Sequence, residues 1–333
     1  MCNCANQNVP MKESPTFAAR IWKCTREALP KSGRTSLWLL KIILPVSLLV
    51  RLLDYYGAIA WLADYMHPLF NLIGLPGALA IVFITSVFLP LYASIAVMTS
   101  LAMTIREATI LTLMCLVAHN LLVECAITKK TGSSFWGMVL LRIGMAFAVA
   151  VFLNALLPAD NTPFELLMQP EQFASLGEVF KAWFQSSMVL IVTIVLIVTA
   201  LMILQRALSE FNLIDLISRP LRPLMRIFGL PDNSPFLWIV GNVVGLAYGG
   251  AVMIDLVEEG KLSLKDSNTV NYHLSISHSL LEDTILFVAL GINWFVIIGT
   301  RLLFAIIVVW GRRFIIYLGR HHNNEKKHST IST

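Results

Sequence analysis

The sequence has 333 residues and a formal net charge of +5; 57% of its residues are hydrophobic and only 14% are charged. A mean hydropathy of +0.73 excludes an ordinary water-soluble protein. The basic residues form short blocks, a pattern that marks the sides of a membrane and excludes a nucleic-acid surface.

The chain opens with a basic segment, residues 1–36, in which residues 18–34 predict a cytoplasmic surface helix that touches anionic lipid. An apolar span follows at residues 37–53. Residues 66–76 are half-polar and end in Gly-Leu-Pro, which is typical of a segment at the membrane interface. Residues 77–99 form a second span, because roughly 20 apolar residues cross about 30 Å of hydrocarbon.

The next segment is mostly apolar but carries basic residues near both ends. Thr104 and Glu107 form a capping-box pattern, which predicts a helix start at residue 105. Tracing the charges along the chain places residue 106 and residues 129–130, all basic, on the same cytoplasmic side. We therefore expect a re-entrant hairpin that enters the membrane, turns at His119 and Asn120, and returns.

A span at residues 135–157 closes the first membrane unit, residues 37–157. We expect residues 158–182 to form an acidic periplasmic linker, whose acidic side chains include Asp160, Glu165, Glu171 and Glu178. Residues 183–318 form the second membrane unit, with a basic connection at residues 206–226, and residues 319–333 form a basic cytoplasmic tail.

The two membrane units are copies of one pattern. MHPLFNLIGLP at residues 66–76 aligns with LRPLMRIFGLP at residues 221–231, an offset of 155. HNLLVE at residues 119–124 aligns with HSLLED at residues 278–283, an offset of 159. Polar, Gly and Pro positions match as well as apolar ones, so this is an internal repeat, with one short insertion at residues 258–262.

Three spans and one hairpin in each copy make an odd number of crossings, which inverts the second copy relative to the first. The second hairpin then turns at residues 277–279 and enters from the opposite face. This arrangement leaves Lys261 and Lys265 outside, where basic residues are disfavoured, although neighbouring acids offset them. The alternative is eight plain transmembrane helices in parallel repeats.

Polar side chains are concentrated in the hairpin segments, above all after residue 268. An ionisable group at membrane depth costs about 2.5 to 3.5 kcal/mol, so such groups persist where they face a polar cavity or a partner. His278 and Glu282 are four residues apart and would share one helix face. A satisfied structural imidazole is the alternative for each histidine. We predict a solute or ion site from these segments: His119, Asn120, Glu124, His273, Ser277, His278, Ser279, Glu282 and Asp283.

The span at residues 236–256 is unusually rich in glycine and reads GNVVGLAYGG at residues 241–250. Its glycines allow either close helix packing or a break that exposes backbone carbonyl groups. Asn242, Tyr248 and Asp255 add polar groups to this span and join the candidate site.

Arg142 and Arg301 lie at equivalent positions, about two turns into the last span of each copy. Each either extends its charge to the interface or pairs with an acid of its own copy, Glu124 and Asp283 respectively. In the second case the arginine holds the hairpin against the last span.

The repeated His-x-Leu-Leu, SHSLLEDT at residues 277–284 and GLAYGG at residues 245–250 together resemble the nucleoside recognition, or Gate, family. That family includes the spore maturation proteins A and B and the gate segments of ferrous iron transporter B, and it is distantly similar to concentrative nucleoside transporters. The resemblance covers nearly all of residues 37–318 and implies inverted repeats with re-entrant hairpins around a solute site. The sequence contains no GxxxxGK[ST] phosphate loop, which argues against nucleotide-driven iron uptake.

We expect an ion-coupled secondary transporter of a small polar solute, such as a nucleoside, in the bacterial inner membrane with both termini cytoplasmic. Glu282 and Asp283 are the expected coupling groups. A pathway for divalent metal cations through the same groups is one alternative, and a non-transporting partner that assembles or regulates another membrane complex is the other. We expect no enzyme, catalytic residue or cofactor. The expected partners are the lipid bilayer, the solute or ion, and a second copy or another membrane protein.

Overall fold

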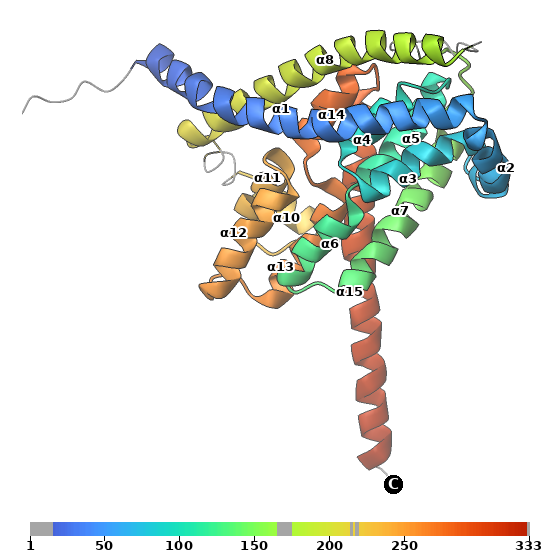
Figure 1. Ribbon diagram of the computed structural model, residues 1–333. Helices are drawn as coiled ribbons and strands as arrows, with labels where there is room; N and C mark the ends of the chain where they lie inside the picture. Colours follow the sequence, from blue (N-terminus) through green and yellow to red (C-terminus); the bar gives the residue numbers. More distant parts are fainter. Residues whose placement is uncertain (1–15, 165–174, 214–215, 217–219, 332–333) are drawn as a thin grey trace, which may run out of the picture.

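The computed structural model describes residues 16–164, 175–213, 216 and 220–331, and within them every regular element is a helix (Figure 1). Residues 1–15 of the N-terminal segment, and Glu165 and Glu171 of the linker, lie outside the described residues. In chain order the elements are α1 (Phe17–Tyr55), α2 (Ala58–Asn71), η1 (Gly77–Leu79), α3 (Ala80–Phe88), α4 (Leu91–Met98), α5 (Ile105–Ala118), α6 (Leu121–Lys130), α7 (Phe135–Leu156), α8 (Leu176–Glu210), α10 (Arg222–Ile227), α11 (Pro235–Val243), α12 (Leu246–Glu258), α13 (Leu264–Ser277), α14 (Leu280–Ala289) and α15 (Trp294–Ile331).

Four helical stretches are long and apolar enough to cross a membrane. They are Ile105–Lys130 over α5 and α6, Phe135–Leu156 in α7, Leu176–Leu208 in α8 and Trp294–Leu318 in α15. The expected all-helical, multi-pass membrane protein is therefore confirmed. The surface helix expected at residues 18–34 and the span at residues 37–53 are one continuous helix, α1.

The second span of each copy is broken, which corrects the single span expected at residues 77–99 and realises, at residues 236–256, the break that the glycines allowed. The first break, at Leu89 and Pro90, has extended backbone between α3 and α4. The second break is at Gly245, whose φ of 101° favours glycine. A Cβ added to Gly249 would lie 3.1 Å from the Cα of Gly241, whereas residues eight apart in a straight helix are about 12 Å apart. The arms α11 and α12 therefore fold back on each other, and α3 likewise packs on α4.

The chain does not turn back at His119 and Asn120, and here the sequence-based hairpin is wrong. Both α5 and α6 pack along α7. Arg106 at the start of α5 donates to the carbonyl of Asn154 near the end of α7 at 2.8 Å, while a short turn joins α6 directly to the start of α7. Helices α5 and α6 thus follow each other as one broken, membrane-crossing helix. The two polar residues interrupt this helix without reversing it.

The second copy repeats the arrangement, with α13 and α14 packed along α15. Arg312 of α15 contacts Thr269 near the start of α13 at 3.3 Å, and Arg301 contacts the carbonyl of Ile276 near its end. The turn expected at residues 277–279 is therefore also a break between two helices that follow each other along α15.

Helices α1 and α8 form a long antiparallel pair across one side of the molecule (Figure 1). Arg20 pairs with Glu210 at one end at 3.3 Å, and the indole of Trp183 donates to Ser47 further along at 3.0 Å. Apolar side chains of α8, among them Leu190 and Ile194, pack against Ala96 of α4. The pair therefore covers the first folded-back pair of helices.

We call one end of the molecule the basic end: it contains Lys129 and Lys130 at the end of α6 with the following turn at residues 131–134, Lys261 and Lys265 at the start of α13, and the Arg312 region of α15. Ser267 of α13 donates to the carbonyl of Thr131 at 2.7 Å, so these segments touch. Lys129 and Lys130 therefore lie with residues 261 and 265, which were expected on the other face, whereas residue 106 lies at the opposite end of the broken helix. The exchange of hairpin and span explains both errors, because it reversed only the stretch between them in each copy and left the direction of α7 and α15 unchanged.

The linker is attached at the end opposite the basic end. The backbone N–H groups of Ile105 and Phe164 donate to the carbonyls of Thr162 and Met103, each at 2.9 Å. Hydrogen bonds from Thr162 to the Asp160 carboxyl hold its pKa below the ordinary value. This part of the linker is therefore attached by backbone hydrogen bonds beside the start of α5.

Candidate functional site

The first half of each broken helix, α5 or α13, ends inside the fold with backbone carbonyls that need hydrogen-bond donors. Arg142 donates from Nε to Val117 O at 2.8 Å and from Nη2 to His119 O at 3.0 Å. Arg301 repeats both contacts, from Nε to Ile276 O at 2.9 Å and from Nη2 to His278 O. An arginine from the neighbouring helix therefore caps each break.

The same two arginines hold a carboxylate from the half-helix that follows the break. Arg142 Nη1 lies 2.6 Å from Glu124 Oε2, and Arg301 Nη1 lies 2.9 Å from Asp283 Oδ2. Both acids are in the first turn of their half-helix, where the helix dipole favours a negative charge. All four side chains are buried, so each pair keeps two charges compensated inside the fold. These are the partners that the sequence suggested.

His119 and His278 end the first half of each broken helix, and we call them the break histidines. The residue after each of them has left-handed backbone: Asn120 has a φ of 45° and Ser279 a φ of 53°. Their N–H groups donate to the first arm of a folded-back pair, Asn120 to Ser86 O at 2.8 Å and Ser279 to Gly241 O at 2.9 Å. Each break is therefore anchored to the folded-back pair of its own copy.

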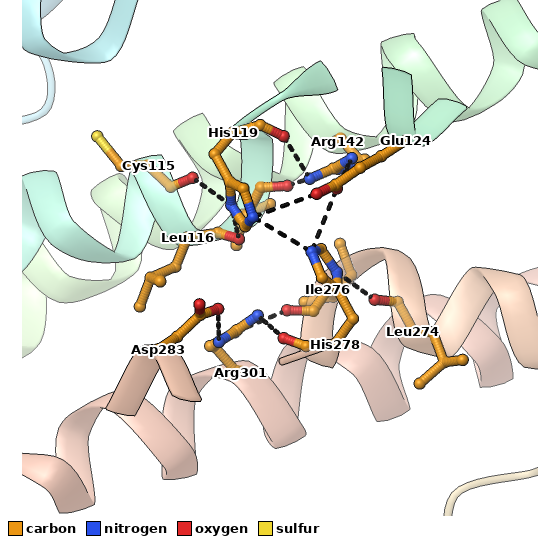
Figure 2. Close-up of polar contacts among 11 residues, drawn as sticks. Cys115, Leu116, His119, Glu124, Arg142, Leu274, Ile276, His278, Asp283 and Arg301 are labelled. Carbon is orange, nitrogen blue, oxygen red and sulfur yellow. Dashed lines mark hydrogen bonds and ion pairs between the residues drawn. The ribbon is translucent and has the colours of Figure 1, made fainter. Parts of the chain in front are cut away.

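The two break histidines, His119 and His278, face each other (Figure 2). Nδ1 of His119 contacts the carbonyls of Cys115 and Leu116 at 3.2 and 3.1 Å, and Nδ1 of His278 contacts Leu274 O at 2.7 Å. A carbonyl only accepts, so each Nδ1 carries the hydrogen. In the neutral rings Nε2 of both histidines is then an acceptor with an open lone pair.

The open Nε2 atoms face each other and a carboxylate. They lie 3.4 Å apart, and Glu124 approaches both, with Oε1 at 3.3 Å from His119 and Oε2 at 3.2 Å from His278. One ligand atom from each of the three residues falls within 4.8 Å of the others. Two acceptor nitrogens and an anionic group thus converge, an arrangement that requires a proton or a cation.

A cavity of about 330 Å³ opens beside this cluster. Its polar lining includes Tyr92, whose hydroxyl donates to Glu282 Oε1 at 2.9 Å. Its remaining lining residues are Thr35, Pro90, Leu91, His119, Asn120, Glu124, Val198, Leu201, Met202, Ser279, Asp283 and Leu286. The cavity therefore lies between both helix breaks, the tip of α3–α4 and the α1–α8 pair.

Most residues predicted from the two break segments lie at this cavity or directly behind it. Two of them do not. His273 and Ser277 hydrogen-bond to each other at 2.9 Å, and Trp238 donates to the same ring at 3.3 Å. His273 is held through Nδ1 alone, and its buried Nε2 has no hydrogen-bond partner among the described residues, so the ring has a structural contact but is only partly satisfied, and it lies outside the cluster.

Of the residues predicted from the glycine-rich span, Asn242 and Asp255 do not join the cluster either. Asn242 is buried and donates to Trp238 O at 2.8 Å. Asp255 is exposed on α12. The side chain of Tyr248 lies outside the described residues.

Part of the polarity after residue 268 is used to join the two copies, which corrects the idea that it all lines a wet cavity. The amide of Asn271 donates to Thr131 Oγ1 and Ser133 Oγ, each at 2.8 Å. Ser133 in turn donates to Asn268 at 2.8 Å. These groups are satisfied by the turn between α6 and α7.

Tyr92 is the cavity residue that the sequence did not single out. A tyrosine in an apolar run is typical of a membrane interface, and only the break at Pro90, two residues earlier, could have placed it deeper.

Comparison with known proteins agrees with the sequence resemblance. The family model described as "Gate: Nucleoside recognition" matches residues 36–134. The chain is 31% identical over 266 residues to "Uncharacterized membrane protein YvoD" of Bacillus subtilis (strain 168), covering 78% of this chain and 85% of that protein. No solved structure matches. A relative of this identity and coverage, together with the matching family model, shows that the chain belongs to the nucleoside recognition (Gate) family of membrane proteins.

Proposed function

We propose that this protein is an ion-coupled secondary transporter of a small polar solute, such as a nucleoside, and that the cavity between the helix breaks is its solute site. The observation that carries the proposal is the cavity of about 330 Å³ that both breaks line. Broken helices facing each other at membrane depth supply polar backbone and side chains to a solute without exposing them to lipid. The volume is in the range of small-molecule sites, roughly 300 to 1,000 Å³.

The lining suits a solute with one polar and one apolar face. Tyr92, Asn120 and Glu282 offer hydrogen-bonding groups on one side. Apolar side chains of α8, Leu201 and Met202 among them, form part of the other. A sugar with its hydroxyl groups, joined to a flat base, matches this division.

The charge around the cavity supports coupling to a cation. The carboxylates of Glu124, Glu282 and Asp283 are set against the guanidinium groups of Arg142 and Arg301. With neutral imidazoles there is one more acid than base, so one cation balances the site.

We further propose inverted repeats, each with three crossing helices and one re-entrant hairpin, the hairpins being α3–α4 and α11–α12. Equivalent contacts in the two copies support this: Asn120 to Ser86 corresponds to Ser279 to Gly241. Three crossings in each copy invert the second one. The number of crossings in each copy is the one that the sequence predicted. The segments expected to be spans, residues 77–99 and 236–256, become the hairpins, and the segments expected to be hairpins become crossing helices.

The orientation follows from charge. The basic end is expected to be cytoplasmic, in the bacterial inner membrane, with both termini on that side. The acidic linker is then periplasmic.

Uptake by purified protein in liposomes tests the function. Labelled nucleosides are offered with an imposed proton or sodium gradient. We expect gradient-driven uptake, and its loss in Glu282→Gln, which removes the charge but keeps the acceptor for Tyr92. Asp255→Asn, at an exposed acid, is the matched control and should retain uptake. Full uptake by Glu282→Gln would remove that residue from the coupling mechanism, and no uptake of any nucleoside under either gradient would contradict nucleoside transport.

A further inference from the structure

We propose that His119, Glu124 and His278 bind one divalent transition-metal ion at the wall of the cavity. The inference rests on the proposed function only in taking the cavity as the solute site. It commits to a cation with affinity for imidazole, such as Zn²⁺, Co²⁺ or Fe²⁺, rather than Mg²⁺ or Ca²⁺, which prefer oxygen ligands.

The spacing of the ligand atoms carries the argument. The two Nε2 atoms are 3.4 Å apart, and the nearer Glu124 oxygen is Oε1 at 3.3 Å for His119 and Oε2 at 3.2 Å for His278. One ligand atom from each of the three residues lies within 4.8 Å of the others. A tetrahedral ion with ligands at about 2.0 to 2.1 Å places neighbouring ligand atoms about 3.3 to 3.4 Å apart. Two histidines and a glutamate therefore already lie at ligand spacing for such an ion.

The outer contacts of both imidazoles match those of metal ligands. A metal-bound histidine typically donates its other N–H to a carboxylate or a backbone carbonyl, which fixes the ring and its tautomer. Nδ1 of His119 and of His278 each face backbone carbonyls of the preceding helical turn. Arg142 lies 2.6 Å from Glu124 and orients that carboxylate in turn.

The site is asymmetric between the copies in the way that a single ion requires. Asp283, the equivalent of Glu124, is one methylene shorter and forms its only described ion pair with Arg301. Only Glu124 approaches both imidazoles. The pseudo-equivalent histidines therefore share one carboxylate and one ion.

The position of the site implies a role in holding the solute. His119 and Glu124 line the cavity, so an ion with three protein ligands has its fourth position available on that side. Sites of this kind keep the fourth position for water or substrate. A hydroxyl or ring nitrogen of the solute is the ligand that we expect there.

Cobalt binding to the full-length protein in detergent tests the proposal. After removal of metals with a chelator, we expect one Co²⁺ per chain, with the visible absorption of a four-coordinate ion, displaced by Zn²⁺ and not by Mg²⁺. His278→Asn keeps an N–H for Leu274 O but removes the ligand, and Glu124→Gln removes the charged one. Each should weaken binding by at least about tenfold, the lower effect seen even for outer contacts.

Two controls account for other histidines. His67→Asn changes an exposed histidine on α2, and His273→Asn changes a buried one outside the cluster; both should bind Co²⁺ as the wild type does. Binding that is absent, or unchanged in both ligand variants, would overturn the metal site. The metal site would also be overturned if His119 and His278 kept a shared proton between them at every Co²⁺ concentration.

The transport assay separates the two proposals. Nucleoside uptake by protein that binds no metal would end the metal inference and leave transport standing. Stoichiometric Co²⁺ binding by a protein that moves no solute would end the transport proposal and leave the metal site standing.

Discussion

Arg142 and Arg301 are the largest side chains that are fully buried in the described residues. Each joins three acceptors, two carbonyls at the end of a half-helix and one carboxylate at the start of the next. A planar guanidinium can serve all three at once, which the single ammonium of lysine cannot do with the same geometry. The arginines thus make the broken helices possible in a membrane.

We predict that Arg301→Met lowers stability by about 3 to 5 kcal/mol, because it leaves Asp283 buried and unpaired. Thermal unfolding in detergent measures the change as a lower Tm. Arg142→Met should behave alike through Glu124.

The control for these variants is Arg26→Met, at an exposed position on α1, which should leave the Tm nearly unchanged. Adding Asp283→Leu to Arg301→Met should recover part of the loss, since the uncompensated charge is gone. An unchanged Tm in Arg301→Met would show that the pair contributes little.

At the scale of elements, the folded-back pair α11–α12 depends on close backbone contact. A side chain at Gly249 would meet the backbone of Gly241 at 3.1 Å, and one at Gly250 would meet Ile127 Cγ2 at 2.3 Å. Backbone cannot move aside as the end of a side chain can, so the two arms need glycine where they touch.

We predict that Gly249→Ala lowers the Tm, because the arms must separate. Gly299→Ala is the matched control: nothing lies within 4 Å of its added Cβ in α15, so it should stabilise by about 0.5 to 1 kcal/mol through helix propensity. A Tm that rises in both variants would mean that the arms are not in contact.

The helix starts could be predicted from the sequence, but the hairpins could not. The capping box of Thr104 and Glu107 forms as expected, and at the start of α13 the Ser263 hydroxyl accepts the N–H of Asp266, which is one half of such a box. A polar pair inside an apolar run, however, is compatible with either a reversal or an interruption of a helix. Hydropathy also runs unbroken across Pro90, where the chain does reverse. Long-range packing decides between these outcomes, and periodicity does not report it.

The residues of the candidate site could largely be predicted from the sequence, but which of them contact one another could not. The repeat indicated that His119 and His278 are equivalent, and the structure brings them within 3.4 Å. Which polar groups would be satisfied by the other copy was not predictable, because Asn271 finds its partners in a turn 140 residues earlier.

At the scale of the molecule, the inverted arrangement predicts which loops share a side. Single cysteines at Lys130 and Lys265, in a variant without the native cysteines, should be labelled from the cytoplasm, and one at Asn161 from the periplasm. Labelling with a membrane-impermeant thiol reagent in intact cells, before and after permeabilisation, measures this. Opposite labelling of positions 130 and 265 would return the chain to the hairpin placement expected from the sequence alone.

The arginine clamps have a mechanical consequence. Because Arg142 ties α5 and α6 to α7, and Arg301 ties α13 and α14 to α15, neither broken helix is free to hinge at its own gap. Glu124 and His278 join the two assemblies at 3.2 Å. The contact between α8 and α4 is apolar and lacks such a clamp in the described residues. If the protein transports as proposed, we expect a passage to open by sliding along α8 rather than by bending at the breaks.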